Sequence, residues 1–378
     1  MFDFELDDGQ LELRAAARRV FDQAGGLALA RRLFELGGGF APELWQTMIA
    51  LDWVGLAVPV AFGGSGGGVL DLYAVCVESG RAVASSPLIP SSVVAAHALA
   101  GAAPENPRVA ELLGRLAVGE AIVAPALVEP SGVWDERGVE TRLVRGAGGA
   151  RVTGTKVVVP FADVAERLLV SARDGDGVSL VLVDPAAAGV SVTPVDNLAS
   201  LPLSAVVMDG VEVDELVGRE GEGWSLLAPA LARGAVLRAA ETAGAGERIL
   251  EMVVEYAKDR SQFGRAIGSY QAVQYLCTDI GIDSHLTNLL ARRAAWLIDT
   301  GRPSQRAVAT AKLYASRSAA HMTHQAHEVF AGVAFMMEHD LHLFTRHAKY
   351  WEHDLGDVRH HREELVGALR TEFGEPPR

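Results

Sequence analysis

The spacing of hydrophobic residues divides the chain into three parts. From residue 8 to about 119, apolar positions recur at helical intervals, interrupted by a glycine-rich loop at 55–68. Residues 121–217 hold short β-rich runs separated by Gly, Pro and Asp, which predict strands. From Trp224 onward, long helical segments joined by short loops suggest an antiparallel bundle. We therefore predict an α+β fold with an N-terminal α-helical domain at 1–119, a β-barrel-like domain at 120–217 and a C-terminal four-helix bundle at 218–378.

Composition and charge narrow the possible functions. Of the 378 residues, 49% are apolar and 22% charged, which is typical of a folded globular protein. The net charge of −14 repels phosphate backbones and anionic lipids, so we expect no nucleic-acid and no membrane partner. Cys76 and Cys277 are too few for a disulfide framework, and the acidic start does not resemble a signal peptide. These features predict a cytoplasmic protein.

Two patterns suggest metal or nucleotide triphosphate sites, and neither is complete. His321, His324 and His327 have helical spacing, but no constellation of carboxylates or cysteines typical of a closed metal site accompanies them. The glycine-rich loop lacks the Lys-Ser/Thr of a phosphate-binding P-loop. We therefore expect neither a metal site nor a nucleotide triphosphate site.

The segment KDRSQFGRAIGSYQAVQ, at 258–274, concentrates arginine, glutamine, aromatic and glycine residues after a long helical pattern. A guanidinium gives forked donors to phosphate, an aromatic face accepts a flat base, and glycines permit close approach of a backbone. The cluster therefore suits a dinucleotide. The alternative is a helix end with a capping glycine and a solvated arginine.

Within a helix–strand–helix chain of this length, R-x-x-F-G-x-x-I-x-x-[FY]-Q resembles the acyl-CoA dehydrogenase family. Five further segments resemble family motifs in the family order, so the likeness covers nearly the whole chain and implies the family's fold. They are GLAVPVAFGGSGGG (55–68), ALVEPSG (126–132), VTGTKVVVPFADVAERLLVSA (152–172), GREGEGW (218–224) and EVFAGVAFMMEHDLHLFTRHAK (328–349).

The resemblance implies FAD as cofactor, held partly by a neighbouring subunit. In the family, the arginine of the 258–274 segment meets the FAD pyrophosphate, and the phenylalanine and glutamine line its adenine. On this resemblance six residues face FAD, namely Arg260, Gln262, Phe263, Ile267, Tyr270 and Gln271. Other cofactor positions depart from the family pattern: Val128, Val158, Pro160 and Glu328 replace family residues, whereas Gly332 is kept.

The resemblance also implies α,β-dehydrogenation of an acyl-CoA, with electrons passing to an electron-transfer flavoprotein. A carboxylate must remove the α-proton, but the usual family position falls on Leu355 and the alternative one near Gly234. Two helical turns beyond Gly234 stands Glu241, with Leu237 and Ala245 in place of basic residues at i±4.

We therefore predict Glu241 as the base, inside an enclosed site. Glu247 is the alternative, Glu352 and Asp357 would need a register shift, and Glu251 and Glu255 are expected at the surface. A solvated Glu241 on a bland helix face also remains open. Small residues near Glu241 suggest room for a bulky acyl group; they are Ala239, Ala240, Gly244 and Gly246.

Three functional hypotheses follow. The first is a homotetrameric dehydrogenase that uses Glu241. The second is a non-catalytic partner in an α2β2 heterotetramer. Actinobacterial acyl-CoA dehydrogenases acting on steroid side chains contain one subunit type that has lost the base, and the V-E-P and G-T-K-V-x-V motifs resemble those of that type. The third is a flavin monooxygenase on the same fold, which needs no base.

Overall fold

The computed structural model describes residues 4–146, 149–175 and 177–374. The α-helices are α1 (Asp8–Gln23), α2 (Gly26–Glu35), α3 (Pro42–Ala50), α4 (Val69–Ala82), α5 (Ala96–Ala102), α6 (Pro107–Ala117), α7 (Gly223–Asp259), α8 (Gln271–Asp299), α9 (Gln305–Phe330), α10 (Leu341–His353) and α11 (Val358–Glu372). The strands are β1 (Val123–Ala126), β2 (Arg142–Gly146), β3 (Gly149–Pro160), β4 (Arg167–Asp174), β5 (Gly177–Val183), β6 (Val190–Pro194), β7 (Leu203–Glu212), β8 (Glu215–Val217), β9 (Ser261–Gln262) and β10 (Arg265–Ala266).

Short helices join several of these elements. Five are 3₁₀-helices and one is a π-helix; they are η1 (Val60–Phe62), η3 (Ala103–Glu105), η4 (Glu136–Gly138), η5 (Ile267–Ser269), η6 (Ala331–Phe335) and the π-helical η2 (Leu88–Ala95). Among the described residues, no helix has both the length and the hydrophobicity that crossing a membrane requires.

The chain forms two compact units, each built from segments distant in sequence. The helical unit contains Met1–Gly37, Val69–Ala84 and Ala235–Arg378, and the sheet unit contains Gly38–Gly68 and Ser85–Gly234. Helix α7 contributes to both. The boundary at Ala235 therefore places Gly234 in the sheet unit and Glu241 in the helical unit.

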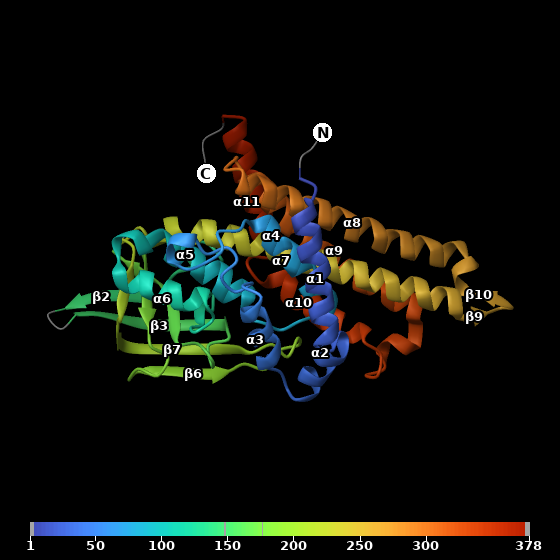
Figure 1. The fold of residues 1–378 in the computed structure, drawn as a ribbon, viewed down its shortest axis with the longest axis horizontal. Coiled ribbons are helices and arrows are strands. Elements are labelled where there is room, and N and C mark those ends of the chain that lie inside the picture. Colours follow the sequence, from blue (N-terminus) through green and yellow to red (C-terminus); the bar gives the residue numbers. More distant parts are fainter. Residues whose placement is uncertain (1–3, 147–148, 176, 375–378) are drawn as a thin grey trace. The chain divides into compact units, whose positions relative to one another are not determined.

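The sheet unit is organised by one mixed sheet in the order β6-β7-β3-β2-β4-β5-β8, with β1 pairing in parallel with β4. Figure 1 labels four neighbouring strands of this sheet, β6, β7, β3 and β2. The apolar strands β4 and β5 are buried along most of their length, as expected for strands covered on both faces. Val170, Val181, Val206 and Met208 belong to the core that these strands share with β7.

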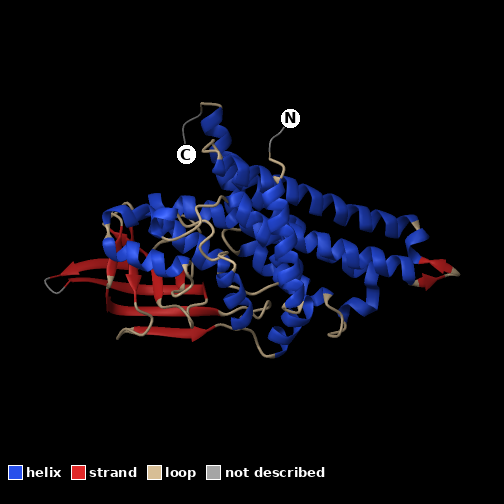
Figure 2. Cartoon of the chain, in the orientation of Figure 1, coloured by secondary structure: helices blue, strands red, loops and turns tan. Residues whose placement is uncertain are grey.

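The helical unit is centred on the long helices α8 and α9, which pack along each other (Figures 1 and 2). Its core includes Ile249 and Val253 of α7, Met322 of α9 and Phe344 of α10. Helices α4 and α7 cross at very short range, because a Cβ on Gly80 would lie 1.9 Å from the Glu241 carbonyl oxygen. Glycine is therefore required at this crossing.

The predicted order of helices, strands and helices is confirmed. Five α-helices, α7 to α11, follow residue 218 in the described part of the chain. The boundary between α10 and α11 arises at residues 354–357, where Gly356 has a left-handed φ of +96° and Asp357 caps α11 by accepting a hydrogen bond from the His360 amide. The domain boundaries 1–119, 120–217 and 218–378 remain a prediction.

Candidate functional site

The 258–274 segment forms a hairpin between α7 and α8. Strands β9 and β10 pair antiparallel, and the turn between them consists of Phe263 and Gly264, both with positive φ. Two left-handed residues give the tight turn that suits a two-residue hairpin, which explains the glycine. The expectation of long helices alone missed this hairpin, since no run of alternating apolar residues marks it.

The hairpin brings several predicted cofactor residues together on an exposed tip. The Phe263 side chain is 93% exposed, and its ring meets the Tyr270 ring edge-on at a centroid distance of 6.4 Å. The Tyr270 hydroxyl donates to the Gln262 carbonyl, and Arg265 lies 4.1 Å above the Tyr270 ring. Arg260 is also exposed. Guanidinium and amide donors beside an exposed aromatic ring fit a dinucleotide.

The remaining predicted residues of the helical unit lie near this hairpin in sequence or at the end of α9. Ile267 packs against the core of the unit, and Gln271 donates a hydrogen bond to the Tyr275 hydroxyl. Glu328 and Gly332 are exposed, and a Cβ at Gly332 would meet nothing within 4 Å. Packing within the described chain therefore does not explain the glycine.

In the sheet unit, the three predicted cofactor positions lie on or beside a bulge in β3. Lys156 pairs with Val206 and Val159 with Ser204, so two residues of β3 oppose one residue of β7. Val158 lies in this bulge with a φ of +48° and is 42% exposed. Such a conformation is strained for a β-branched residue, and strain of this kind clusters at functional sites. Val128 is buried beside the bulge, and Pro160 ends the strand.

Glu241 lies in the helical unit with both carboxylate oxygens engaged. Oε1 accepts a hydrogen bond from the Ser79 hydroxyl of α4 at 2.9 Å, and Oε2 accepts one from the Arg238 guanidinium. The carboxylate is buried, as predicted. The inference that it has no basic partner is wrong, because it considered only i±4, whereas Arg238 stands at i−3 on the same helix face.

Burial raises the pKa of Glu241 above its ordinary value, although Arg238 and Ser79 oppose the shift. Arg238 is shared with a second acid, since its Nε donates to Asp354 at 2.9 Å. Its guanidinium also stacks on the Tyr350 ring, 4.9 Å from the centroid. The geometry is that of a closed ion-pair cluster.

Leu355, to which the resemblance assigns the usual position of the base, lies in a loop held by buried polar groups. Leu355 has a φ of +58°, and its carbonyl accepts a hydrogen bond from His361 at 2.8 Å. The buried Lys312 ammonium donates to the carbonyls of Trp351 and Gly356 at 2.9 and 2.8 Å. The loop is therefore fixed on both sides of a residue that cannot accept a proton.

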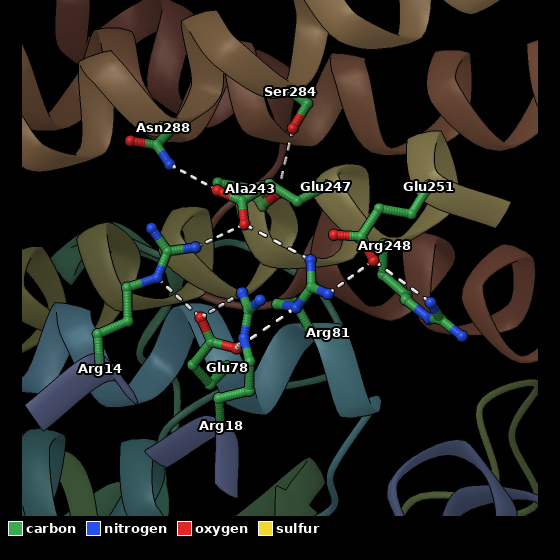
Figure 3. Close-up of polar contacts among 10 residues, drawn as sticks. All are labelled: Arg14, Arg18, Glu78, Arg81, Ala243, Glu247, Arg248, Glu251, Ser284 and Asn288. Carbon is green, nitrogen blue, oxygen red and sulfur yellow. Dashed lines mark hydrogen bonds and ion pairs between the residues drawn. The ribbon is translucent and has the colours of Figure 1, made fainter. Parts of the chain in front are cut away.

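Glu247, the alternative base, belongs to an ion-pair network of the helical unit (Figure 3). Its carboxylate accepts hydrogen bonds from Arg14 at 2.5 Å and from Asn288 at 3.0 Å. The same network surrounds the buried Glu78 with three arginines, Arg14, Arg18 and Arg81. These contacts link α1, α4, α7 and α8, so the Glu247 carboxylate holds helices together.

The other candidate carboxylates also have partners. Glu251 pairs with Arg81 and Arg248, and both Glu251 and Glu255 are exposed, as expected. Glu352 pairs with Lys349, and Asp357 caps α11. The two positions to which the resemblance assigns the base, Leu355 and the neighbourhood of Gly234, carry no carboxylate.

The small residues around Glu241 do not provide the predicted room within the helical unit. A Cβ on Gly244 would lie 1.8 Å from the Val77 carbonyl oxygen, and one on Gly246 would lie 2.5 Å from the Met322 sulfur. Ala239 and Ala240 are buried. The hypothesis of an acyl pocket is therefore wrong at Gly244 and Gly246, where the space is filled by neighbouring helices.

Sequence reasoning missed three functional or supporting side chains: Arg238, Lys312 and Lys156. Arg238 could have been found from its i−3 position relative to Glu241. Lys312 lies in a helix of ordinary amphipathic appearance, and no sequence signal marks its burial. Lys156 lies in the 152–172 segment and Glu129 in the 126–132 segment, and only the structure shows that the two are buried against each other.

Comparison with known proteins agrees with the geometry. Residues 7–120 match the model of the acyl-CoA dehydrogenase N-terminal domain, and residues 221–357 match that of the C-terminal domain. The chain is 32% identical over 327 residues to acyl-CoA dehydrogenase FadE27 of Mycobacterium tuberculosis, covering 84% of this chain and 85% of that protein.

Two solved structures extend the likeness. One is the ChsE4–ChsE5 complex of Mycobacterium tuberculosis, to which the chain is 29% identical with a TM-score of 0.88 and full coverage of both chains. The other is PigA with FAD and proline, at 25% identity and a TM-score of 0.87, covering 98% of this chain and all of that one.

Proposed function

The chain belongs to the acyl-CoA dehydrogenase family, and we propose that it is a subunit that completes FAD sites together with a second, homologous chain that supplies the catalytic carboxylate. Two observations carry this proposal. The positions that the resemblance assigns to the base hold Gly234 and Leu355, which have no carboxylate. The nearby Glu241 carboxylate already accepts hydrogen bonds from Arg238 and Ser79.

An ion-paired carboxylate is a poor acceptor for the α-proton of a thioester. The proton transfer needs a base within hydrogen-bond reach of the substrate carbon, with its acceptor oxygen available. In Glu241, Arg238 and Ser79 occupy one oxygen each, and protonation of the carboxylate would leave Arg238 with Asp354 as its remaining carboxylate partner. Removal of the α-proton is therefore assigned to the partner chain.

FAD is the cofactor of this family, and when bound it supplies the oxidant that accepts the β-hydrogen of the acyl-CoA as hydride. The residues of this chain would bind and orient it. Arg260 supplies forked donors for a pyrophosphate, and Phe263 an exposed aromatic face for the adenine. In the sheet unit, Val158 and Pro160 would present an apolar surface to the flavin ring.

Two further features support a two-chain enzyme. The exposed hairpin tip carries an almost fully exposed phenylalanine, an arrangement that suits contact with another subunit better than contact with water. The likeness to the ChsE4–ChsE5 complex extends over the full chain, and that structure is a complex of two differently named proteins. Electrons would leave through an electron-transfer flavoprotein, as the family resemblance implies.

Purification tests the proposal directly. The chain is produced alone and together with a homologous chain that carries a glutamate at one of the two family base positions. Native mass measurement and flavin absorbance then give the subunit composition and the FAD content. We expect an α2β2 assembly with bound FAD only from the co-production. A yellow homotetramer from the chain alone would contradict the proposal.

A second candidate function is a self-sufficient dehydrogenase that uses Glu241 as its base. It is favoured by the burial of this carboxylate and by the raised pKa that burial causes, since both are expected of a general base. It requires Arg238 to release Glu241 when substrate binds. Replacement of Glu241 by glutamine separates the two candidates.

A further inference from the structure

A buried ion pair lies beneath the β3 bulge of the sheet unit. The Lys156 ammonium donates to Glu129 Oε1 at 2.7 Å, to the Ser171 hydroxyl at 3.1 Å and to the Leu127 carbonyl at 3.3 Å. The Glu129 carboxylate also accepts the Thr141 amide with both oxygens, at 3.0 and 3.1 Å. Both side chains are almost completely buried, and every hydrogen bond of the Lys156 ammonium stays inside the unit.

The pair joins two segments that the family resemblance places at the flavin. Glu129 directly follows Val128, and Lys156 directly precedes the bulge residues Val157 and Val158. The Val157 amide donates to the Val128 carbonyl at 2.8 Å, so the two segments are also joined through the backbone. The two segments are therefore joined by a side-chain ion pair and by a backbone hydrogen bond.

The strained conformation at Val158 needs such support. A valine with a φ of +48° is held only where its surroundings prevent relaxation of the backbone. Lys156 is the last residue that keeps its regular pairing with β7 before the bulge, and its side chain is fixed by three acceptors. The side-chain contacts of Lys156 therefore fix the backbone position at which the bulge begins.

The cost of burying two charges argues against a purely stabilising role. A buried ion pair adds little net stability compared with apolar residues of the same volume, so its retention calls for another reason. Here the pair also fixes geometry. Burial raises the pKa of Glu129, but Lys156 and Thr141 hold it below its ordinary value. The Glu129 carboxylate is therefore an ionised acceptor that fixes two donors at once.

We propose that Glu129 and Lys156 are positioning residues, which hold the Val128 segment and the Val157–Val158 bulge in the shape that receives the flavin ring. Neither side chain would touch the cofactor. The inference rests on the function proposed above insofar as these segments face FAD.

The test compares an apolar double variant with the wild-type chain, both without FAD. Replacement of both partners, E129L/K156M, removes both charges together but leaves the buried Thr141 amide without its Glu129 acceptor, so the midpoint of a denaturant titration is expected to fall while the chain still folds. Amide hydrogen exchange then reports on the local shape. We expect peptides covering 127–129 and 156–160 to exchange about tenfold faster in the double variant, with the rest of the sheet unit unchanged.

The control removes a different ion pair of the same unit. Arg115 and Glu166 form two hydrogen bonds, at 2.8 and 2.6 Å, and neither hydrogen-bonds to the Val128 segment or the bulge. R115Q/E166Q is expected to leave exchange at 127–129 and 156–160 unchanged. Wild-type exchange rates at these peptides in E129L/K156M would overturn the proposal, because the pair would then be dispensable for the local shape.

A conservative variant covers the case in which the double variant does not fold. K156R keeps the charge but replaces a compact ammonium by a planar fork, which cannot reach the same three acceptors. Faster exchange confined to the same peptides is expected, and unchanged exchange would overturn the proposal. FAD titration of the assembled protein is the second readout: wild-type protein that binds no FAD would refute the proposed function while leaving the exchange result standing.

Discussion

Arg238 donates a hydrogen bond to Glu241 three residues further along α7, inside the helical unit. This pairing decides between two accounts of the chain, because the same carboxylate is either a structural partner of Arg238 or the base of a dehydrogenase.

Replacement of Glu241 by glutamine is expected to leave the turnover of the assembled enzyme unchanged. Removal of a true general base lowers turnover by about 10²–10⁴-fold. The cost is expected in stability instead, at about 1–3 kcal/mol, since the buried Arg238 loses the negative charge of its acceptor. Steady-state kinetics and denaturant titration measure the two effects. E247Q is the control, because it also removes a carboxylate that pairs with arginine, Arg14. A hundredfold loss of turnover in E241Q alone would make Glu241 the base.

Replacement of Phe263 by alanine is expected to weaken FAD binding about tenfold and leave the stability of the isolated chain unchanged. The ring is 93% exposed, so it contributes little to the fold, whereas stacking on a flat base contributes roughly 1–3 kcal/mol. Fluorescence titration of FAD into the assembled protein measures the affinity. F373A removes a phenylalanine that is 80% exposed in the last part of the described chain, and equal loss in both variants would show that Phe263 has no special role.

Substitution of Gly80 by alanine is expected to lower stability by about 2–3 kcal/mol, because the added Cβ would lie 1.9 Å from the Glu241 carbonyl oxygen and would force α4 and α7 apart. The matched control is Gly367 of α11, where a Cβ meets nothing within 4 Å. G367A is expected to raise stability by about 0.5–1 kcal/mol, since alanine favours the helix. Denaturant titrations of both variants give the comparison, and a neutral G80A would show that the helices separate easily.

Acid is expected to destabilise the helical unit through two buried histidines. Burial lowers the pKa of His347 to about 4 and that of His361 to about 3. The folded chain holds these rings neutral, whereas the unfolded chain protonates them near pH 6.5. The free energy of unfolding is therefore highest above pH 6.5 and decreases as the pH falls toward the folded-state pKa values of about 4 and 3. At pH 5 each histidine is expected to cost about 2 kcal/mol.

Thermal unfolding measured from pH 7 to pH 5 checks this dependence. H347F removes one titrating ring and is expected to show a shallower decline of the unfolding temperature. H285Q replaces an exposed histidine and is expected to follow the wild type. An identical decline in H347F and the wild type would show that the buried ring does not control acid stability.

The sequence predicted the fold well because the helical and strand patterns are long and the family motifs keep their order. Several residues that the sequence predicts to face FAD lie together at the hairpin, but the hairpin itself was not predicted, since its strands contain only two residues each. Short elements of this kind carry no periodicity.

The site was harder to predict because contacts between distant helices determine it. The burial of Glu241 could be anticipated from its apolar neighbours, but its hydrogen bond from Ser79 joins residues 162 positions apart. Small residues near Glu241 look like room for a substrate in the sequence, whereas Gly244 is small because α4 passes directly over it. A glycine marks close packing and open space alike.

The central claim is that this chain completes an FAD site without supplying the base, and flavin reduction tests it most directly. The chain alone, supplied with free FAD, and the FAD-loaded assembly with a glutamate-bearing homologous chain are each mixed anaerobically with a panel of acyl-CoAs, and flavin absorbance is followed. We predict bleaching by at least one acyl-CoA in the assembly and none in the chain alone. Bleaching of the chain alone, abolished by E241Q, would contradict the account and establish Glu241 as the base.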